Sequence, residues 1–437
     1  MAAGQKRVAG GMVAGYLGSL GVRRRLVDLS TKLRPGRPRL EFYWRAEDAY
    51  SHIMAQLVAR LVDAYPLDLE ITVVPAAAAE VDPEPQLRAA HAVRDARALA
   101  SFYELSFSPR SDTPRPDRVR RANAVALLPR PPREHLDVLL RVGEAIFGEG
   151  GAALSELART LGAVEGTLVT TTLEANYLTL RERGHYQSAT LRYGGEWYEG
   201  PHRILNLEER LARQAKAGAP APESVLRRRV PSALPVEAAG TPFEVWFSFR
   251  SPYSYLAAVQ IAPWVRGEPG VQRRLRFRPL LPMVMRGLQV PTAKKLNLLR
   301  DAKREADRLG IPFGRIVDPV GSGAERCMAV YAAVEASGRG FDFALSAAQG
   351  IWSEAVDVAS DAGLYLVAER AGVSSAEVDA ALMDLPAGLA LAEDNRSALQ
   401  DAGLWGVPSF RVGSLTTWGQ DRLPLVAHAL GLPAQRP

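Results

Sequence analysis

The sequence is nearly free of cysteine, since Cys327 is the single one among 437 residues. No disulfide can form within one chain, and dithiol–disulfide exchange needs two thiols, so this chain by itself cannot perform it. Cys327 is followed by Met328, Ala329 and Val330. This apolar setting is typical of a buried structural thiol rather than a reactive one. The six histidines do not occur in pairs at metal-ligand spacing, so we expect no metal site.

Long hydrophobic runs, and basic blocks interleaved with aromatic residues, are also missing. No segment reaches the length of a membrane span, and a net charge of +6 is small for this length. Residues 6–21 resemble a signal peptide only faintly, because they carry five glycines and run into three arginines. We expect residues 6–21 to form a surface helix or a frayed tail. The protein should be cytoplasmic, with neither a nucleic-acid nor a membrane partner.

Residues 249–258 mark a transition from a predicted strand to a predicted helix. The preceding residues 243–247 are apolar and aromatic, as in a buried strand, and apolar residues at helical spacing follow. Pro252 falls near the first helical position, where its missing N–H costs nothing. Ser251 and the free N–H groups of the first turn then face whatever lies above the strand end. A helix N-terminus of this kind favours an anion.

The pattern around this transition occurs twice in the chain. Matching residues keep an offset of 203 at the start of each copy, 205 midway and 219 near the end. Because the matches keep the same order, we predict two copies of one domain of about 190 residues. The matches include Glu41 and Glu244, Asp48 and Ser251, Tyr50 and Tyr253, Ser51 and Ser254, Asn176 and Asn395, and Arg192 and Arg411.

These matches and the changes in composition predict four regions. A basic lead-in covers residues 1–36, and the first copy of the domain covers 37–214. Residues 215–240 are rich in alanine and proline, which is the composition of a linker. The second copy of the domain covers 241–437.

Each copy is expected to run strand, helix, strand, a long helical block, two short strands and a final helix. This order is a thioredoxin-like layout, so the predicted fold class is α/β, with two tandem thioredoxin-like domains. Each domain is a small mixed sheet with a large all-helical insertion. Predicted strands lie at 40–44, 67–74, 243–247, 275–281, 409–412 and 415–418.

The helical block is expected to differ between the copies. In the first copy, 108–132 is rich in proline and arginine and is interpreted as a mobile loop. In the second copy, Ser375 is a candidate helix cap. Predicted helices there lie at 293–309, 324–336, 343–351, 356–371, 374–383 and 389–402.

Four stretches of the second copy carry a resemblance to a known family. They are Ser-Pro-Tyr-Ser-Tyr-Leu at 251–256, Arg-Pro-Leu-Leu at 278–281, Gly-Val-Pro-Ser-Phe at 406–410 and Trp-Gly-Gln-Asp-Arg at 418–422. With the helical block between them they cover roughly 243–430. This part resembles the 2-hydroxychromene-2-carboxylate isomerases and the kappa-class glutathione transferases, in the DsbA-like branch of the thioredoxin superfamily. Where those relatives carry a Gly-Asn element, this chain has no asparagine at 285–291.

The resemblance places Ser251 and Ser254 where the redox relatives carry Cys-x-x-Cys. It implies that Ser251 is the catalytic residue and that glutathione is the cofactor. A serine hydroxyl can donate a hydrogen bond to a bound thiolate, and with the helix dipole it would lower the pKa of the glutathione thiol. The alternative is that Ser251 is an ordinary N-cap serine.

The resemblance also implies a binding surface for the rest of glutathione. Pro408 falls where the superfamily has a cis-proline, and the backbone of Val407 would pair with the cysteinyl part. Gln420 and Asp421 would bind the γ-glutamyl end. The alternatives are a trans-proline that opens an edge strand, and an Asp421 that caps the last helix and pairs with Arg422.

The first copy keeps the frame of the domain but changes these residues. Asp48 stands for the serine, Ala49 for the following proline, Ala189 for the cis-proline and His202 for the aspartate. A carboxylate satisfies a helix N-terminus by itself and would repel a thiolate, so we expect no glutathione site in this degenerate copy. Asp48 and His202 could form an acid–base pair or a purely structural one.

The leading interpretation is a glutathione-dependent isomerase or transferase that acts on a hydrophobic, aromatic small-molecule electrophile. In the isomerase case, the thiolate would add to an activated double bond, let the adduct rotate or open, and then be expelled. One alternative, a DsbA-like oxidoreductase partner, is disfavoured by the serines at the cysteine positions. Another is a DsbA-like protein without dithiol redox activity that serves as a ligand-binding or scaffold protein. Duplication also makes an intramolecular pseudo-dimer plausible.

Overall fold

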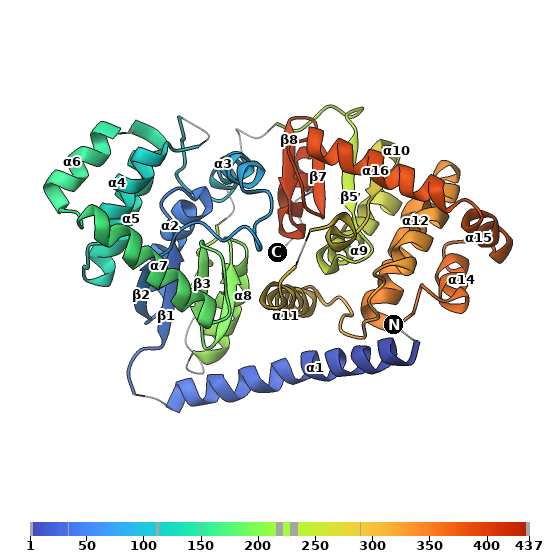
Figure 1. Ribbon diagram of the computed structural model, residues 1–437, viewed down its shortest axis with the longest axis horizontal. Coiled ribbons are helices and arrows are strands. Elements are labelled where there is room, and N and C mark those ends of the chain that lie inside the picture. Colours follow the sequence, from blue (N-terminus) through green and yellow to red (C-terminus); the bar gives the residue numbers. More distant parts are fainter. Residues whose placement is uncertain are drawn as a thin grey trace. The chain divides into compact units, whose positions relative to one another are not determined.

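The computed structural model divides the chain into two compact units (Figure 1). The N-terminal unit comprises Arg23–Leu234 and Pro291–Asn297. The C-terminal unit comprises the chain up to Val22, Pro235–Val290 and the chain from Leu298 onward. Residues 216–221 and 228–234 of the predicted linker lie outside the described residues. The structure describes residues 3–33, 35–110, 113–149, 151–215, 222–227, 235–288 and 290–433.

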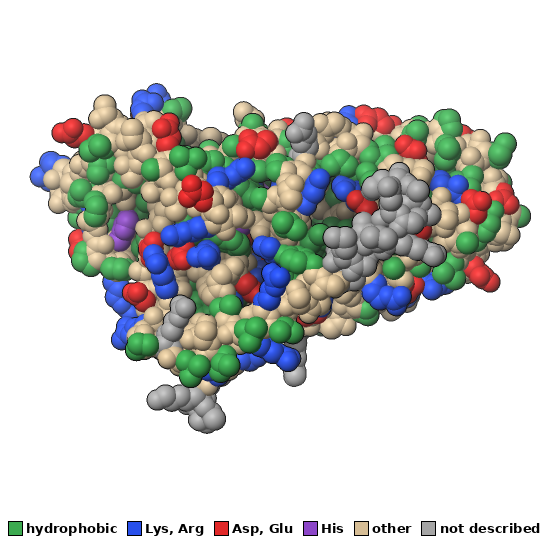
Figure 2. Space-filling model, turned by 60° about the horizontal axis from the view of Figure 1, so that its bottom comes forward, with side chains coloured by type: hydrophobic (Ala, Val, Ile, Leu, Met, Phe, Trp, Pro, Cys, Tyr) green, Lys and Arg blue, Asp and Glu red, His purple; other side chains and the backbone are tan. Residues whose placement is uncertain are grey.

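The predicted lead-in is largely one helix, α1 (Ala3–Leu33). Leu17 of α1 is buried in the hydrophobic core of the C-terminal unit. Within the described ranges, no helix is both long enough and apolar enough to cross a membrane. Acidic and basic side chains are interspersed over the face shown in Figure 2, in keeping with the small net charge.

A four-stranded mixed sheet of order β6-β5-β7-β8 forms the centre of the C-terminal unit. The central strand β5 (Phe243–Phe247) pairs in parallel with β6 (Leu275–Pro279) and antiparallel with β7 (Ser409–Val412). β7 continues through Gly413, at φ +55°, into the antiparallel edge strand β8 (Leu415–Trp418). Every residue of β5 is buried because both faces of the sheet are covered, which explains its unbroken apolar run. The predicted strands of this unit are confirmed.

Helices fill the connections of this sheet. Two lie between β5 and β6, most of the insertion lies between β6 and β7, and two short helices follow β8. The predicted cap of α15 is wrong by one residue. Ser374 accepts the N–H of Glu377, and the Glu377 carboxylate accepts the N–H of Ser374, so together they form a capping box. The helices are α9 (Pro252–Gly267), α10 (Pro269–Arg274), η2 (Met283–Arg286), α11 (Thr292–Leu309), α12 (Ser322–Val334), η3 (Glu335–Ser337), α13 (Gly340–Gln349), η4 (Gly350–Glu354), α14 (Asp361–Glu369), α15 (Ser375–Leu382), α16 (Leu385–Asp401), η5 (Gln420–Arg422) and α17 (Leu423–Ala429).

Cys327 lies on α12, inside the core of the C-terminal unit. Its side chain is fully buried among apolar residues. Burial raises the pKa of the thiol, because the charged thiolate loses its hydration there. The prediction of a buried structural cysteine is confirmed.

The N-terminal unit has a sheet of the same order, β2-β1-β3-β4. β1 pairs in parallel with β2 and antiparallel with β3, and β3 pairs antiparallel with β4. The elements of this unit are β1 (Arg39–Trp44), α2 (Ala49–Ala64), β2 (Asp68–Val73), α3 (Pro85–Phe102), α4 (Pro116–Ala126), α5 (Pro132–Glu144), η1 (Ala145–Glu149), α6 (Gly151–Leu161), α7 (Gly166–Glu182), β3 (Thr190–Tyr193), β4 (Glu196–Glu199) and α8 (Arg203–Gln214).

The mobile loop predicted at 108–132 is wrong, because α4 lies within it. Pro116 and Asp117 occupy the first turn of α4, where a missing N–H is harmless and a negative charge is favourable. Ala122, Val125 and Ala126 are buried and give the helix one apolar face. The sequence did not indicate this helix, because the apolar residues on its buried side are few and the surrounding residues are rich in proline and arginine.

The two units share details beyond the order of their strands. Each helical block contains a π-helical turn, η1 in one unit and η4 in the other, at the same offset of 205 residues. In each central strand a buried glutamate lies opposite an arginine and forms an ion pair with it. The pairs are Glu41 with Arg192 and Glu244 with Arg411.

Close packing of α16 on α12 should make Gly388 intolerant of any side chain. A Cβ atom at Gly388 would lie 2.6 Å from the backbone nitrogen of Ala329. We expect Gly388→Ala to lower the free energy of unfolding by about 1–3 kcal/mol. The control is Gly270→Ala on α10, because a Cβ atom at Gly270 would have no heavy atom within 4 Å. It should be neutral or slightly stabilising. Denaturant midpoints measure both, and equal midpoints would contradict the prediction.

Burial of His52 on α2 should make the N-terminal unit sensitive to acid. Burial lowers the pKa of His52 to about 4, against roughly 6.5 in an unfolded chain. Between these values the unfolded state binds more protons, so stability falls as the pH falls, by about 1.4 kcal/mol per pH unit. We expect His52→Gln to reduce the loss of melting temperature between pH 7 and pH 5. A variant that loses as much melting temperature as the parent between these pH values would contradict the prediction.

Candidate active site at the start of α9

The turn between β5 and α9 presents Ser251 as the cap of the helix. Ser251 has extended backbone angles, φ −102° and ψ 115°, and its Oγ accepts the N–H of Ser254 at 3.1 Å. Pro252 begins the helix directly after it. The N-cap role, which the sequence left as an alternative, is therefore confirmed as the local role of Ser251. Capping uses the oxygen lone pair and leaves the hydroxyl proton for another acceptor.

The Ser251 hydroxyl group points toward the segment that precedes β7. Its Oγ lies 3.4 Å from the backbone oxygen of Val407, a residue 156 positions away in the sequence. Hydroxyl hydrogen bonds to oxygen usually measure 2.5–3.0 Å, so this one is long and weak. A ligand atom that accepts more strongly could therefore take over the proton.

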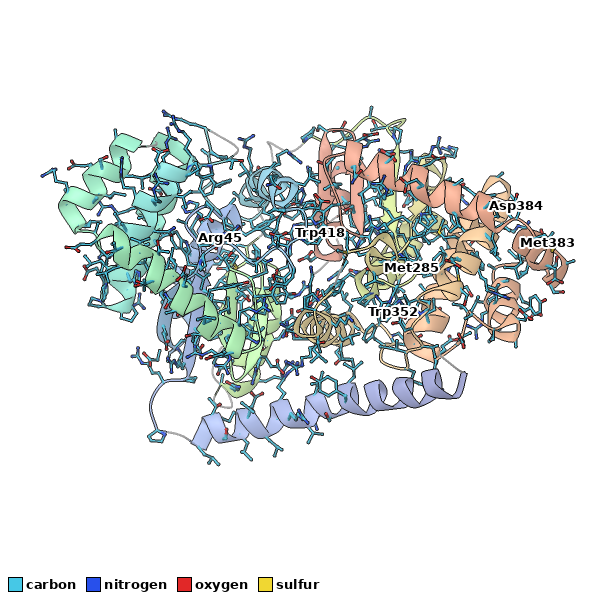
Figure 3. The ribbon with its side chains drawn as sticks, viewed as in Figure 1. Arg45, Met285, Trp352, Met383, Asp384 and Trp418 are labelled. Atoms are coloured by element: carbon cyan, nitrogen blue, oxygen red, sulfur yellow. The ribbon has the colours of Figure 1, made fainter. Side chains whose placement is uncertain are left out.

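The Val407–Pro408 peptide bond is cis, as the resemblance to a known family implies, and the trans alternative is wrong. The backbone oxygen of Pro408 accepts the N–H of Gly419 at 2.9 Å, which joins this turn to the residues after β8. Gly406 lies against the indole of Trp418, labelled in Figure 3, because a Cβ there would be 2.6 Å from the indole nitrogen. The roles of Val407 and Pro408 in binding a ligand stay a prediction.

Ser254 occupies the second of the two cysteine positions of redox relatives, but its side chain is fully buried. Its Oγ accepts the backbone N–H of Ser248 at 3.3 Å, across the turn that carries Ser251. The indole of Trp352 supports the same turn by donating to the backbone oxygen of Phe249 at 3.1 Å. Ser254 therefore holds the turn together, and Ser251 is the one of the pair that remains partly exposed.

Gln420 lies beneath the site, and protein groups occupy its carboxamide. Its Nε2 donates to Glu305 at 2.9 Å, and its oxygen accepts from Gln260 at 3.1 Å. The predicted contact of Gln420 with a γ-glutamyl group remains untested, but as placed the amide links η5 to α9 and α11. Sequence reasoning missed Glu305 and Gln260. The position of Glu305 in the sequence could have indicated its burial. It lies on the same side of α11 as Ala302 and Ala306, which are buried.

Asp421 follows Gln420 at the end of β8. Its carboxylate lies 3.0 Å from the guanidinium of Arg422, which confirms the local pairing that the sequence left as an alternative. The helix cap expected with that pairing is wrong, because α17 has no side-chain cap. Gly419 precedes it at φ +108°, a conformation that favours glycine. The predicted contact of Asp421 with the γ-glutamyl ammonium group is a further role that stays untested.

These residues fit glutathione unequally along its length. At the thiol end, the Ser251 hydroxyl and the first turn of α9 offer a donor and a helix dipole to a negative sulfur. At the γ-glutamyl end, Asp421 can contribute a charge, whereas Gln420 is buried and already hydrogen-bonded. The structure thus supports the thiol end of the predicted site more fully than the γ-glutamyl end.

The equivalent turn of the N-terminal unit is occupied by its own carboxylate. Asp48 caps α2 and accepts the N–H of Tyr50 at 3.2 Å, the hydroxyl of Ser51 at 2.9 Å and the hydroxyl of Ser188 at 2.7 Å. Ala189 follows at φ +53° where the other unit has its cis-proline. The prediction that the Asp48 carboxylate satisfies this helix N-terminus is confirmed.

His202 has its own hydrogen bond in this unit. Its Nε2 lies 2.7 Å from the hydroxyl oxygen of Tyr103, and both side chains are buried. The carboxylate of Asp48 accepts hydrogen bonds from three other groups, so a pair of Asp48 with His202, acid–base or structural, stays a prediction.

A known domain family is similar to the second half of the chain. The DSBA-like thioredoxin domain matches residues 243–431, whereas no curated protein matches the sequence. A solved structure of 2-hydroxychromene-2-carboxylate isomerase is 22% identical, with 43% of this chain and 94% of that chain covered and a TM-score of 0.36.

Two further solved structures belong to redox proteins. A probable DsbA oxidoreductase from Streptomyces coelicolor is 14% identical, with 45% and 93% of the two chains covered and a TM-score of 0.35. The cytosolic disulfide reductase DsbM from Pseudomonas aeruginosa is 18% identical, with 40% and 87% covered and a TM-score of 0.31. The match to the DSBA-like thioredoxin domain covers the C-terminal sheet and the Ser251 turn.

Proposed function

We propose that the protein is a glutathione-dependent isomerase or transferase, with its site at the start of α9. The observation that carries the proposal is the geometry of Ser251. It caps the helix through its oxygen, while its proton has only a long contact of 3.4 Å with the Val407 backbone oxygen. A hydroxyl donor at a helix N-terminus suits a thiolate.

The residues around Ser251 have distinct roles in this proposal. Ser251 holds the sulfur by a hydrogen bond, the backbone of Val407 aligns the cysteinyl part, and Asp421 attracts the γ-glutamyl ammonium group. The buried Gln420 fixes the position of Asp421 through its bonds to α9 and α11. Bound glutathione supplies a nucleophilic sulfur for attack on a hydrophobic, aromatic electrophile.

The proposal extends to the architecture, in which both units are copies of one DsbA-like domain. Identical strand order, the π-helical turns at equal offset and the matched glutamate–arginine pairs support a duplication. One hydrogen bond from a backbone N–H to a serine oxygen also occurs at matching positions in the two units. Ser51 accepts the N–H of Arg45 as Ser254 accepts that of Ser248. The thiolate site belongs to the C-terminal copy, because Asp48 fills its counterpart in the other.

Replacing Ser251 should weaken binding of the reduced cofactor. A hydrogen bond to a charged group contributes about 1.5–3 kcal/mol, so Ser251→Ala should raise the Kd for glutathione about tenfold or more. Isothermal titration calorimetry on the full chain measures this. Ser374→Ala removes the cap of α15 and is the matched control: it should lose about 1 kcal/mol of stability without changing the Kd.

S-methylglutathione separates the thiol from the rest of the ligand. It cannot form a thiolate, so it should bind the parent protein and Ser251→Ala with equal affinity. Loss of both ligands in Ser251→Ala would instead indicate a distorted site. Absence of binding of millimolar glutathione to the parent protein would overturn the proposal and favour a ligand-binding or scaffold protein of another kind.

Thiolate binding also predicts a dependence on pH. If the site lowers the thiol pKa below its free value of roughly 8.5, binding releases a proton between the two pKa values. Affinity for glutathione should then rise with pH across that interval, by up to tenfold per pH unit, and level off above the free pKa. Titrations at several pH values should show this slope for the parent and a flatter one for Ser251→Ala. A parent protein whose affinity did not change with pH would show that the neutral thiol is bound.

A further inference from the structure

The second half of α1 carries apolar side chains on its outer surface. Val22, Leu26, Leu29 and Leu33 are exposed by 59%, 63%, 56% and 77%. Their spacing of four, three and four residues puts all of them on one side of the helix. Contiguous apolar surface of this kind is uncommon on a soluble protein and marks a site of interaction.

The opposite side of this half of α1 is polar and faces the N-terminal unit. Arg24 donates to the Glu196 carboxylate at 2.8 Å, and Asp28 accepts two hydrogen bonds from Arg210, at 2.6 and 2.8 Å. Arg210 is almost completely buried. Rolling the helix to bury its leucines would break this pair and leave a buried charge without its partner, which is strongly unfavourable. The orientation of the helix is therefore fixed with its apolar side outward.

The charges on the outer side of α1 are positive. Arg25 and Lys32 are exposed next to the leucines, and the Lys32 ammonium group also donates to the backbone oxygen of Arg213 at 3.3 Å. The single carboxylate of residues 22–33, that of Asp28, is turned inward to Arg210. Figure 2 shows apolar and basic side chains gathered over this end of α1. If a second copy of the chain packed the same apolar residues against these, the positive charges of the two copies would lie close together and repel each other. An anionic surface with an apolar layer beneath it matches both the charges and the leucines.

We propose that residues 22–33 of α1 form a peripheral docking face for an anionic lipid surface. The leucines enter the boundary between headgroups and acyl chains, while Arg25 and Lys32 contact the headgroups. The expectation of no membrane partner rested on the lack of a spanning segment, and a peripheral helix needs none. This face is independent of the site at Ser251.

Sedimentation with lipid vesicles tests the docking face on the full chain. The parent protein should sediment with vesicles that contain phosphatidylserine, much less with pure phosphatidylcholine vesicles, and less as salt is added. The double variant Leu26→Glu/Leu29→Glu should lower the bound fraction at least tenfold. The matched control is Leu168→Glu/Leu178→Glu on α7, where the two leucines are exposed by 54% and 63%. It should bind as the parent does.

Three results would overturn the docking proposal. They are a parent protein that does not bind phosphatidylserine vesicles, an equal loss of binding in both double variants, and binding that is insensitive to lipid charge. A parent dimer in solution that Leu26→Glu/Leu29→Glu converts to a monomer, without vesicle binding, would assign the stripe to a second copy of the chain. Circular dichroism melting of each variant distinguishes loss of docking from loss of folding.

Discussion

Antiparallel pairing of β5 with β7 is the constraint on which the candidate site depends. Trp246, near the end of β5, lies opposite Ser409 at the start of β7. The turn that leaves β5 and the turn that enters β7 are therefore brought to one edge of the sheet, although about 160 residues separate them. Ser251 and the cis bond of Val407–Pro408 meet there for this reason. Any function of this turn requires the sheet to be paired in this register.

Buried charge supports that register. Glu244 in the middle of β5 is paired with Arg278 of β6 and Arg411 of β7, the strands on either side. A slip of one residue would turn the carboxylate to the other face and leave it buried without partners, at a cost of several kcal/mol. Glu41 in β1 pairs with Arg192 of β3 and with Arg183, which follows α7 and lies outside the sheet. The ion pairs thus link three strands in the C-terminal unit and two in the N-terminal unit.

A change of one residue type separates the two helix N-termini chemically. Ser251 and Asp48 both cap a helix from nearly the same backbone conformation. The serine leaves the turn neutral with a proton to donate, whereas the aspartate brings its own negative charge and collects three donors. The same frame can therefore receive an anion in one unit and exclude it in the other. The backbone angles of the two capping residues match, so this contrast comes from the charge of their side chains.

The sequence by itself determined the strands of the C-terminal unit, the strand-to-helix turn at Ser251 and the buried cysteine. Each of these depends on local residue type or on short periodic patterns, which a sequence displays directly. The cis bond at Pro408 was expected instead from the resemblance to a known family. Short helices such as α4 were hidden by proline and arginine. Only the tertiary structure decided that Gln420 is enclosed by Gln260 and Glu305, and that α1 turns its leucines outward. Those outcomes depend on which distant side chains satisfy a polar group, and that pairing exists only once the chain has folded.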